Sequence, residues 1–266
     1  MMATKKYTHL FFDLDNTIWD FNANSYDALQ VALDRLELLD PIGSYDDFFK
    51  IYSEVNEKLW EQYRQGTMTK KVLSVQRFEE SFEKHGTPLP KGGASVNETY
   101  LTEMPLQTRL VDGARELLDH LHGKYEMSVI TNGFKEVQYD KIQKSGLSKY
   151  FKKIFISEEI GAQKPNKLIF EQAVKSMNAR KKKSLMIGDS WDADIIGALN
   201  FGMDQVYFAP NLDKSEIPSN KWGSVEYITV IPTYPPNKNG TNPIILNSNN
   251  TTTTFITHLE DILYFL

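Results

Sequence analysis

Short apolar runs recur along this chain and alternate with stretches of helical periodicity. The runs lie at 9–12, 127–130, 154–156, 184–187 and 205–208, the last of them being the expected final strand. Most are rich in aromatic or β-branched residues and too short for a helix, which is the pattern of a buried strand. Strands that alternate with helices form parallel sheets covered by helices on both faces. The alternation therefore predicts an α/β fold with a doubly wound parallel sheet.

The long stretch between the first and second runs breaks this rhythm. It contains successive segments with apolar residues at helical spacing, separated by stops at Gly66 and Gly86. An all-helical segment has no place in the alternation of strands and helices. We therefore expect residues 21–107 to form an inserted helical cap domain, and residues 1–20 and 108–266 to form the core.

The segment from about 210 to 254 has a different composition, in which proline alternates with asparagine and threonine. Such a segment buries too little apolar surface to offset the entropy of ordering it. We expect a flexible insertion here, in which 228–231 has the pattern of an edge strand. The apolar spacing at 259–263 predicts a closing helix.

Charge and composition exclude several classes of partner. The chain has 266 residues, a formal net charge of -5 and no cysteine. Disulfides and thiolate metal sites are thereby excluded, and an acidic chain is not expected to bind nucleic acid polymers or anionic membranes. No apolar run approaches the roughly 20 residues that span a bilayer, and the N-terminus lacks the pattern of a signal peptide. We expect a cytoplasmic protein; the sequence does not give its oligomeric state, and a monomer is compatible with it.

Polar residues follow three of the predicted strands at the point where each ends. Asp13 and Asp15 follow the first strand, Thr131 ends the second, and Asp189 follows the fourth. Ligands of open α/β sheets bind outside the carboxyl ends of the strands, so these groups are expected to share one crevice. Lys164, between the third and fourth strands, adds an ammonium group.

Carboxylates gathered in this way predict a magnesium site and a phosphate-transfer reaction. Neighbouring carboxylates repel one another unless a cation lies between them, and all-oxygen sites suit Mg²⁺. With the metal bound, Asp13 can attack phosphorus while Asp15 protonates the leaving oxygen and later activates water. Lys164 offsets charge on the transferred group. The Thr131 hydroxyl and the neighbouring backbone N–H groups, at Asn132 and Gly133, hold its oxygens.

Each motif also has a purely structural interpretation. An Asp-x-Asp after a strand is common in turns and helix caps, and Thr-Asn-Gly is a good turn. Gly188-Asp189-Ser190 can simply cap the helix that follows. It is the occurrence of all of them at successive strand ends that favours catalysis.

The ordered set resembles the haloacid dehalogenase superfamily. Its first motif is matched by 13–17, its second by 131–133, its lysine by Lys164 and its acidic motif by 188–190. The resemblance covers nearly the whole chain outside about 210–254. It implies a Rossmann-like core with a helical cap inserted directly after the first motif.

The resemblance also implies roles for the acidic residues. Asp13 and Asp189 would bind Mg²⁺ through their side chains, and Asp15 through its backbone carbonyl. Asp194 would steady the acidic loop, with Asp192 as the alternative for that role. Asp15 disfavours dehalogenation, because a halide leaving group needs no proton.

Several stretches are similar to a narrower group, the bacterial pyrimidine nucleoside 5′-monophosphate phosphatases: 56–60, 77–78, 130–134 and 157–167. This similarity implies a small phosphorylated substrate, a nucleoside monophosphate. A flat base requires an aromatic face and a few polar contacts. The candidates for the face are Trp19, Phe21, Trp60, Tyr63 and Phe78, and those for polar contacts are Asn22, Asn56 and Arg77; Trp19, Phe21 and Asn22 are preferred because they follow the first motif.

Three alternatives stay open on the sequence. The same machinery serves phosphatases of sugar phosphates and other small metabolites, and mutases of the β-phosphoglucomutase type. A catalytically idle binding module is disfavoured, because an idle site has no need of Asp13, Asp15, Lys164 and Asp189 together.

Overall fold

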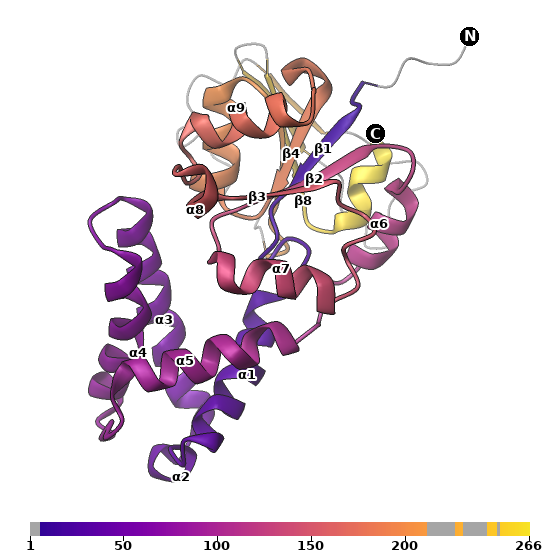
Figure 1. Cartoon of the computed structure of the whole chain (residues 1–266). Helices are drawn as coiled ribbons and strands as arrows, with labels where there is room; N and C mark the ends of the chain where they lie inside the picture. The colour runs from indigo at the N-terminus through magenta and orange to yellow at the C-terminus, as the bar shows by residue number, and fades with distance from the viewer. Residues whose placement is uncertain (1–5, 212–226, 231–243, 249–250) are drawn as a thin grey trace. The chain divides into compact units, whose positions relative to one another are not determined.

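The computed structural model describes residues 6–211, 227–230, 244–248 and 251–266 (Figure 1). The chain divides into two compact units. Unit 1 comprises Met1–Asp20, Leu110–Lys135 and Gly146–Leu266, and unit 2 comprises Phe21–Arg109 and Glu136–Ser145. Residues 136–145 thus group with the helices that follow the first strand, although they lie beyond the expected cap. The division into core and cap domains, with its boundaries at 20/21 and 107/108, stays a prediction.

Unit 1 is built on one sheet, which has eight strands in the described residues, in the order β3-β2-β1-β4-β5-β8-β7-β6. The strands are β1 (His9–Phe12), β2 (Glu126–Thr131), β3 (Lys153–Ile156), β4 (Ser184–Gly188), β5 (Asp204–Phe208), β6 (Tyr227–Val230), β7 (Ile244–Ser248) and β8 (Thr251–Ile256). The first six in spatial order pair in parallel, and β7 and β6 complete the sheet with antiparallel pairs. The parallel strands and the helices between them confirm the predicted α/β, Rossmann-like fold.

Helices α9 (Lys167–Ser176) and α10 (Gly197–Phe201) cover one face of the sheet in unit 1. The other helical segments of unit 1 are α6 (Ala114–Leu121), α8 (Ser157–Ile160), η2 (Lys181–Lys183), η3 (Trp191–Ile196) and η5 (Leu259–Tyr264). Phe11, Ile130 and Met186, from three adjacent strands, share one buried cluster with Phe170 of α9 and Ala198 of α10. These two helices therefore pack on the face that carries Phe11 and Met186. The predicted closing helix at 259–263 is confirmed as η5.

The expectation that 205–208 is the final strand is wrong. After β5 the chain adds β6, β7 and β8, and β8 pairs in parallel with β5. The expectation of an edge strand at 228–231 is confirmed for 228–230, since β6 lies at the edge of the sheet.

The predicted flexible insertion at 210–254 is likewise wrong for 227–230, 244–248 and 251–254, which form strands, while 212–226, 231–243 and 249–250 lie outside the described residues. Threonine is polar, which suggested a loop, but it is also β-branched and favours strands. Two hydrogen bonds join these threonines to strand β5. Thr253 Oγ1 donates to Gln205 Oε1 at 2.6 Å, and the backbone N–H of Thr252 donates to Asp204 Oδ1 at 2.9 Å.

Unit 2 is helical in the described residues. Its elements are α1 (Phe21–Arg35), α2 (Leu39–Ile42), α3 (Tyr45–Arg64), α4 (Lys70–His85), α5 (Gly92–Glu103), the short η1 (Met104–Leu106) and all but the first residue of α7 (Lys135–Lys144). Helices α3 and α4 lie side by side (Figure 1). Ser44 and Thr69 cap their N-termini, and Gly86 ends α4 in the left-handed conformation. The helices expected from the apolar periodicity are therefore present.

Among the described residues, every helix is too short or too polar to cross a lipid bilayer.

Candidate active site

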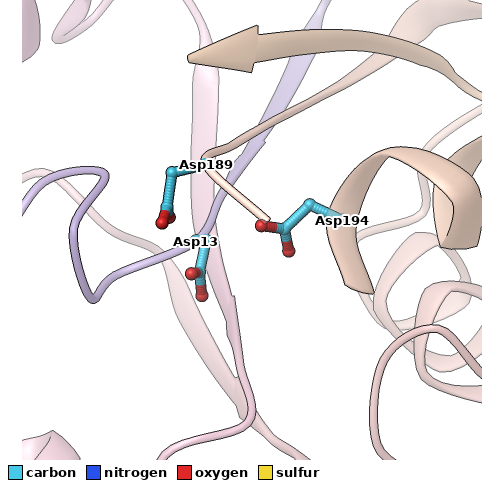
Figure 2. A group of neighbouring side chains, drawn as sticks. All are labelled: Asp13, Asp189 and Asp194. Carbon is cyan, nitrogen blue, oxygen red and sulfur yellow. The ribbon is translucent and has the colours of Figure 1, made fainter. Parts of the chain in front are cut away.

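Three carboxyl groups meet at the carboxyl edge of the sheet in unit 1. Asp13 directly follows β1, Asp189 directly follows the adjacent strand β4, and Asp194 lies in η3. One oxygen of each lies within 4.8 Å of the others. Figure 2 shows Asp194 reaching from its helix toward the other two side chains. Two of the three were expected to meet here because parallel strands end at the same edge.

The alternation of side chains explains the direction of Asp13. Phe11 and Met186 point to the face covered by α9 and α10. Two residues further along, Asp13 and Gly188 emerge on that same face. Lys164, just before α9, and Asp194, just before α10, belong to this helical layer and therefore come close to Asp13.

Lys164 is the electrostatic centre of the site. Its side chain is buried, with 2% exposed. Nζ donates to Asp13 Oδ1 at 2.7 Å, to Asp194 Oδ1 at 2.6 Å and to the backbone oxygen of Ile130 at 2.8 Å. Burial lowers the pKa of Lys164, but the charges of Asp13 and Asp194 outweigh it, so the pKa lies above its ordinary value. The ammonium is therefore charged at neutral pH.

Asn132 fixes the backbone of this lysine. Its Nδ2 donates to the Lys164 backbone oxygen at 2.9 Å, and its Oδ1 accepts the Lys164 backbone N–H at 2.8 Å. Both ends of the side-chain amide are thus engaged with one residue. The phosphate contact predicted for Asn132 stays a prediction, and it would come from the backbone N–H rather than from this amide.

Asp194 is enclosed completely and uses both oxygens within the protein. Oδ1 accepts from Lys164, and Oδ2 accepts the backbone N–H of Ser190 at 3.0 Å. The Ser190 side chain in turn caps η3 by accepting the N–H of Ala193 at 3.3 Å. Gly188 makes room for this arrangement, since a Cβ there would lie 2.6 Å from that of Asp194. The position suits a residue that steadies the acidic loop.

Burial and mutual repulsion perturb the two strand-end carboxyls. Burial raises the pKa of Asp13 well above its ordinary value; Lys164 opposes this effect, and Asp194 and Asp189 add to it. Burial, followed by the charge of Asp194, raises the pKa of Asp189 to about 7 despite a hydrogen bond from Thr17 Oγ1 at 2.7 Å. Carboxyls held in this way gain from a cation between them.

The donor chemistry of the site fits magnesium. Asp13 and Asp189 offer carboxylate oxygens, and Asp194 is already engaged by Lys164 and Ser190. Hard divalent cations prefer such oxygen ligands.

The loop after β1 is closed by its own backbone. Asn16 adopts a positive φ of 59°, and its N–H donates to the Trp19 backbone oxygen at 2.7 Å. The backbone N–H of Trp19 donates to the Leu14 oxygen at 2.8 Å, and Trp19 forms an isolated β-bridge with Asp15. This turn holds Thr17 next to Asp189. Thr17 lies within the first motif, which is the signal that could have identified it, although no role was predicted for it.

Thr131 ends β2 with its side chain buried, and its Oγ1 accepts the backbone N–H of Gly133 at 3.1 Å. The hydroxyl therefore shapes the turn that follows β2. Lys135, at the end of this turn, donates its N–H to Glu158 Oε2 at 2.9 Å.

The predicted base contacts lie in very different environments. Trp19 is fully enclosed in unit 1, so its ring would have to be uncovered to touch a ligand. In unit 2, Phe21 is half-buried with Lys141 Nζ 5.5 Å from its ring centre, and Asn22 is exposed. The Trp60 and Tyr63 rings pack edge to face at 5.5 Å.

Arg77 and Phe78 lie in the interior of unit 2. Arg77 donates to Asn97 Oδ1 at 2.7 Å and, more weakly, to Asn56 Oδ1 at 3.4 Å. Its guanidinium lies 4.8 Å from the ring centre of the buried Phe78. These contacts hold helices α3, α4 and α5 together, and a role in substrate binding stays a prediction.

Comparisons with known proteins agree with this geometry. Residues 7–202 match the family described as haloacid dehalogenase-like hydrolase. The chain is 35% identical over 207 residues to the pyrimidine 5′-nucleotidase PynA of Streptococcus pneumoniae, covering 77% of this chain and 85% of that protein. It is 34% identical over 199 residues to the pyrimidine 5′-nucleotidase YjjG of Escherichia coli, covering 74% and 84%.

A third relative is the HAD-hydrolase YfnB of Bacillus subtilis, 31% identical over 231 residues, which cover 86% of this chain and 91% of that protein. A crystal structure of YfnB bound to magnesium is similar with a TM-score of 0.72, covering 79% of this chain and 92% of that one.

Proposed function

Because the chain belongs to the haloacid dehalogenase-like hydrolase family, we propose that it is a Mg²⁺-dependent phosphatase with Asp13 as its nucleophile. The observation that carries the proposal is the setting of Asp13. Its carboxylate lies at a strand end, 2.7 Å from a buried lysine and beside a second carboxyl group. A fixed, charge-balanced carboxylate of this kind is suited to covalent catalysis.

Asp13 and Asp189 would hold the ion through their side chains, with the backbone carbonyl of Asp15 as a further ligand. Their oxygen-only donor set and the magnesium bound in the YfnB structure support this assignment. When bound, Mg²⁺ offsets negative charge on the phosphoryl group. Asp194 holds the acidic loop in place by accepting the backbone N–H of Ser190.

The reaction proceeds in two displacements. A carboxylate oxygen of Asp13 attacks phosphorus, the bond to the ester oxygen breaks, and Asp15 gives that oxygen a proton. Asp15 then takes a proton from water, whose oxygen attacks the phosphorus of the aspartyl-phosphate. The bond to Asp13 breaks, which releases inorganic phosphate and restores both side chains.

Lys164 and the turn after β2 stabilise the transferred group. The buried ammonium of Lys164 balances charge beside Asp13. The hydroxyl of Thr131 and the backbone N–H groups of Asn132 and Gly133 are the donors for phosphoryl oxygens. Asp15 supports phosphate over halide chemistry, since only an alkoxide leaving group needs its proton.

The substrate class that we propose is a pyrimidine nucleoside 5′-monophosphate. It is supported by the similarity to two pyrimidine 5′-nucleotidases over three quarters of this chain. The alternatives are sugar phosphates and other small phosphorylated metabolites, which would use the same residues.

Phosphate release from a substrate panel tests this class. We expect UMP, dUMP and dTMP to show higher kcat/KM than ribose 5-phosphate and glucose 6-phosphate in the presence of Mg²⁺. p-Nitrophenyl phosphate serves as the control, because its hydrolysis reports the chemistry without a base. If it is hydrolysed while the sugar phosphates rank above the nucleotides, the substrate class is wrong and the phosphatase proposal stands.

A further inference from the structure

A row of residues runs across the sheet directly below the acidic loop. The registers place Gly188 of β4 beside Tyr207 of β5, and Tyr207 beside Phe255 of β8. Residues paired in this way on parallel strands present their side chains to the same face. The row therefore ends in two aromatic rings on the face from which Asp13 and Asp194 approach each other.

Helix η3 lies over this row and touches it at two points. Asp194 fills the space above Gly188, where a Cβ would collide with it. Trp191, the first residue of η3, packs on both aromatic rings. Its ring centre lies 5.4 Å from Tyr207 in an edge-to-face arrangement and 6.0 Å from Phe255 in a stacked one. Tyr207 and Phe255 also contact each other, at 5.7 Å.

In the sequence, Asp189 lies between the two points of contact, Gly188 and Trp191. It directly follows the row at Gly188, and only Ser190 separates it from Trp191. Its carboxyl lies among like charges from Asp13 and Asp194, which push it away when no cation is bound. Two contacts oppose this displacement of Asp189. On one side, Lys164 holds Asp194 over Gly188. On the other side, the ring contacts of Trp191 hold the start of η3 against the sheet.

Tyr207 faces the same loop. Burial raises the pKa of its hydroxyl, and the charges of Asp189 and Asp192 raise it further.

We infer that Trp191 and Phe255 are positioning residues that hold Asp189 in place for Mg²⁺, so that the C-terminal strand β8 sets the affinity of the metal site. The inference rests on the proposed function. It concerns a strand outside the residues that match the family model, because that match ends at residue 202 and β8 begins at Thr251.

Calorimetric titration of the full chain with Mg²⁺ alone tests the inference. Residues that orient metal ligands typically change metal affinity by about 10–100-fold when they are removed. We expect the Kd for Mg²⁺ to rise about tenfold or more in Phe255→Ala and in Trp191→Leu. Trp191→Phe, which keeps a ring on Phe255, should stay within about threefold of wild type.

Ile256→Ala is the matched control. Ile256 is as buried as Phe255, at 2% exposed, and as the next residue of the same strand it points to the opposite face. We expect this variant to lose stability but to keep the wild-type Kd. Thermal unfolding checks that each variant is folded, and Phe255→Leu replaces Phe255→Ala if the latter is not.

Tryptophan emission gives an independent signature. The chain has four tryptophans, and the difference between wild type and Trp191→Phe isolates the contribution of Trp191. We expect Mg²⁺ to change the emission of wild type and of Ile256→Ala more than that of Trp191→Phe.

Wild-type affinity in folded Phe255 and Trp191→Leu variants, or an equal loss in Ile256→Ala, would overturn the inference and leave the proposed function intact. Absence of Mg²⁺ binding by the wild-type chain would overturn both.

Discussion

At the scale of single residues, Lys164 decides whether the buried charges of the site are tolerable. It lies between the carboxylates of Asp13 and Asp194, which are about as close to it as hydrogen bonds allow. A buried ion pair adds little stability compared with apolar residues, but removing one partner leaves the others uncompensated. Replacing Lys164 alone should therefore lower the free energy of unfolding by more than the intact ion pair contributes to it.

Lys164→Met should lower the free energy of unfolding by roughly 3–5 kcal/mol at pH 8, as expected when a buried ion pair loses one partner. The loss should be smaller at pH 5, because burial raises the pKa of Asp13, and its protonation removes part of the charge that the lysine balanced. Urea unfolding at both pH values measures it. Lys167→Met, at an exposed position three residues away, is the control and should have little effect. An equal loss at the two pH values would contradict this account.

At the scale of elements, the contact between β4 and η3 depends on the absence of a side chain at Gly188. In Gly188→Ala the new methyl group would meet the Asp194 carboxyl group. Overpacking of this kind typically costs about 1–3 kcal/mol. We expect that loss of stability together with a fall in kcat/KM, because the shift of Asp194 also moves Lys164.

Gly123→Ala provides a matched control for that variant. Nothing lies within 4 Å of the added methyl group, although its φ of 74° strains the backbone. It should lose stability and keep its kcat/KM. If Gly188→Ala retains wild-type kcat/KM, then η3 adjusts without disturbing the site and the argument for this contact is wrong.

The elements also show what a sequence can predict. Strands β1 to β5 were predictable because most are short apolar runs with aromatic or β-branched residues between helices. Strand β8 was missed because Thr251–Thr254 is polar, and the sequence does not show that Gln205 of the neighbouring strand accepts the hydroxyl hydrogen of Thr253. A local sequence pattern identifies a strand by its apolar residues. Strand β8 has none of them in its first four residues, and pairing with β5 becomes visible only in the folded protein.

The candidate site divides in the same way. That Asp13 and Asp189 lie close together was predictable because strand ends of a parallel sheet share one edge, and Lys164 was expected near them because it precedes the helix between the third and fourth strands. The hydrogen bonds from Asn132 to the Lys164 backbone and from Thr17 to Asp189 were not. They depend on side-chain directions that are set only when the loops pack together.

At the scale of the whole molecule, the raised pKa of Asp189, about 7, links folding to pH. An unfolded aspartate has a pKa of ~3.9, so the folded state binds this proton more tightly. A carboxyl group shifted upward stabilises the folded state below its folded pKa, and that stability is lost as pH rises from ~4 through about 7. Asp13, also shifted upward, acts in the same direction.

Without Mg²⁺, the melting temperature should therefore fall between pH 5.5 and pH 8. Saturating Mg²⁺ should reverse this trend, because the metal binds the deprotonated carboxylates. Differential scanning calorimetry in EDTA and in MgCl₂ measures both effects. Asp189→Asn should flatten the dependence in EDTA, whereas Asp192→Asn, at an exposed position of η3, should leave it unchanged. A melting temperature in EDTA that rises with pH over this range would refute the linkage.

The central claim is that Asp13 becomes phosphorylated, and acid-quench trapping of the phosphoenzyme tests it most directly. The chain is mixed with ³²P-labelled substrate and Mg²⁺, quenched within milliseconds and digested, and the labelled peptide is identified by mass spectrometry. We predict label on the peptide that contains Asp13, and neither label nor phosphate release in Asp13→Asn. Label on a different residue, or full hydrolysis by Asp13→Asn, would contradict the account.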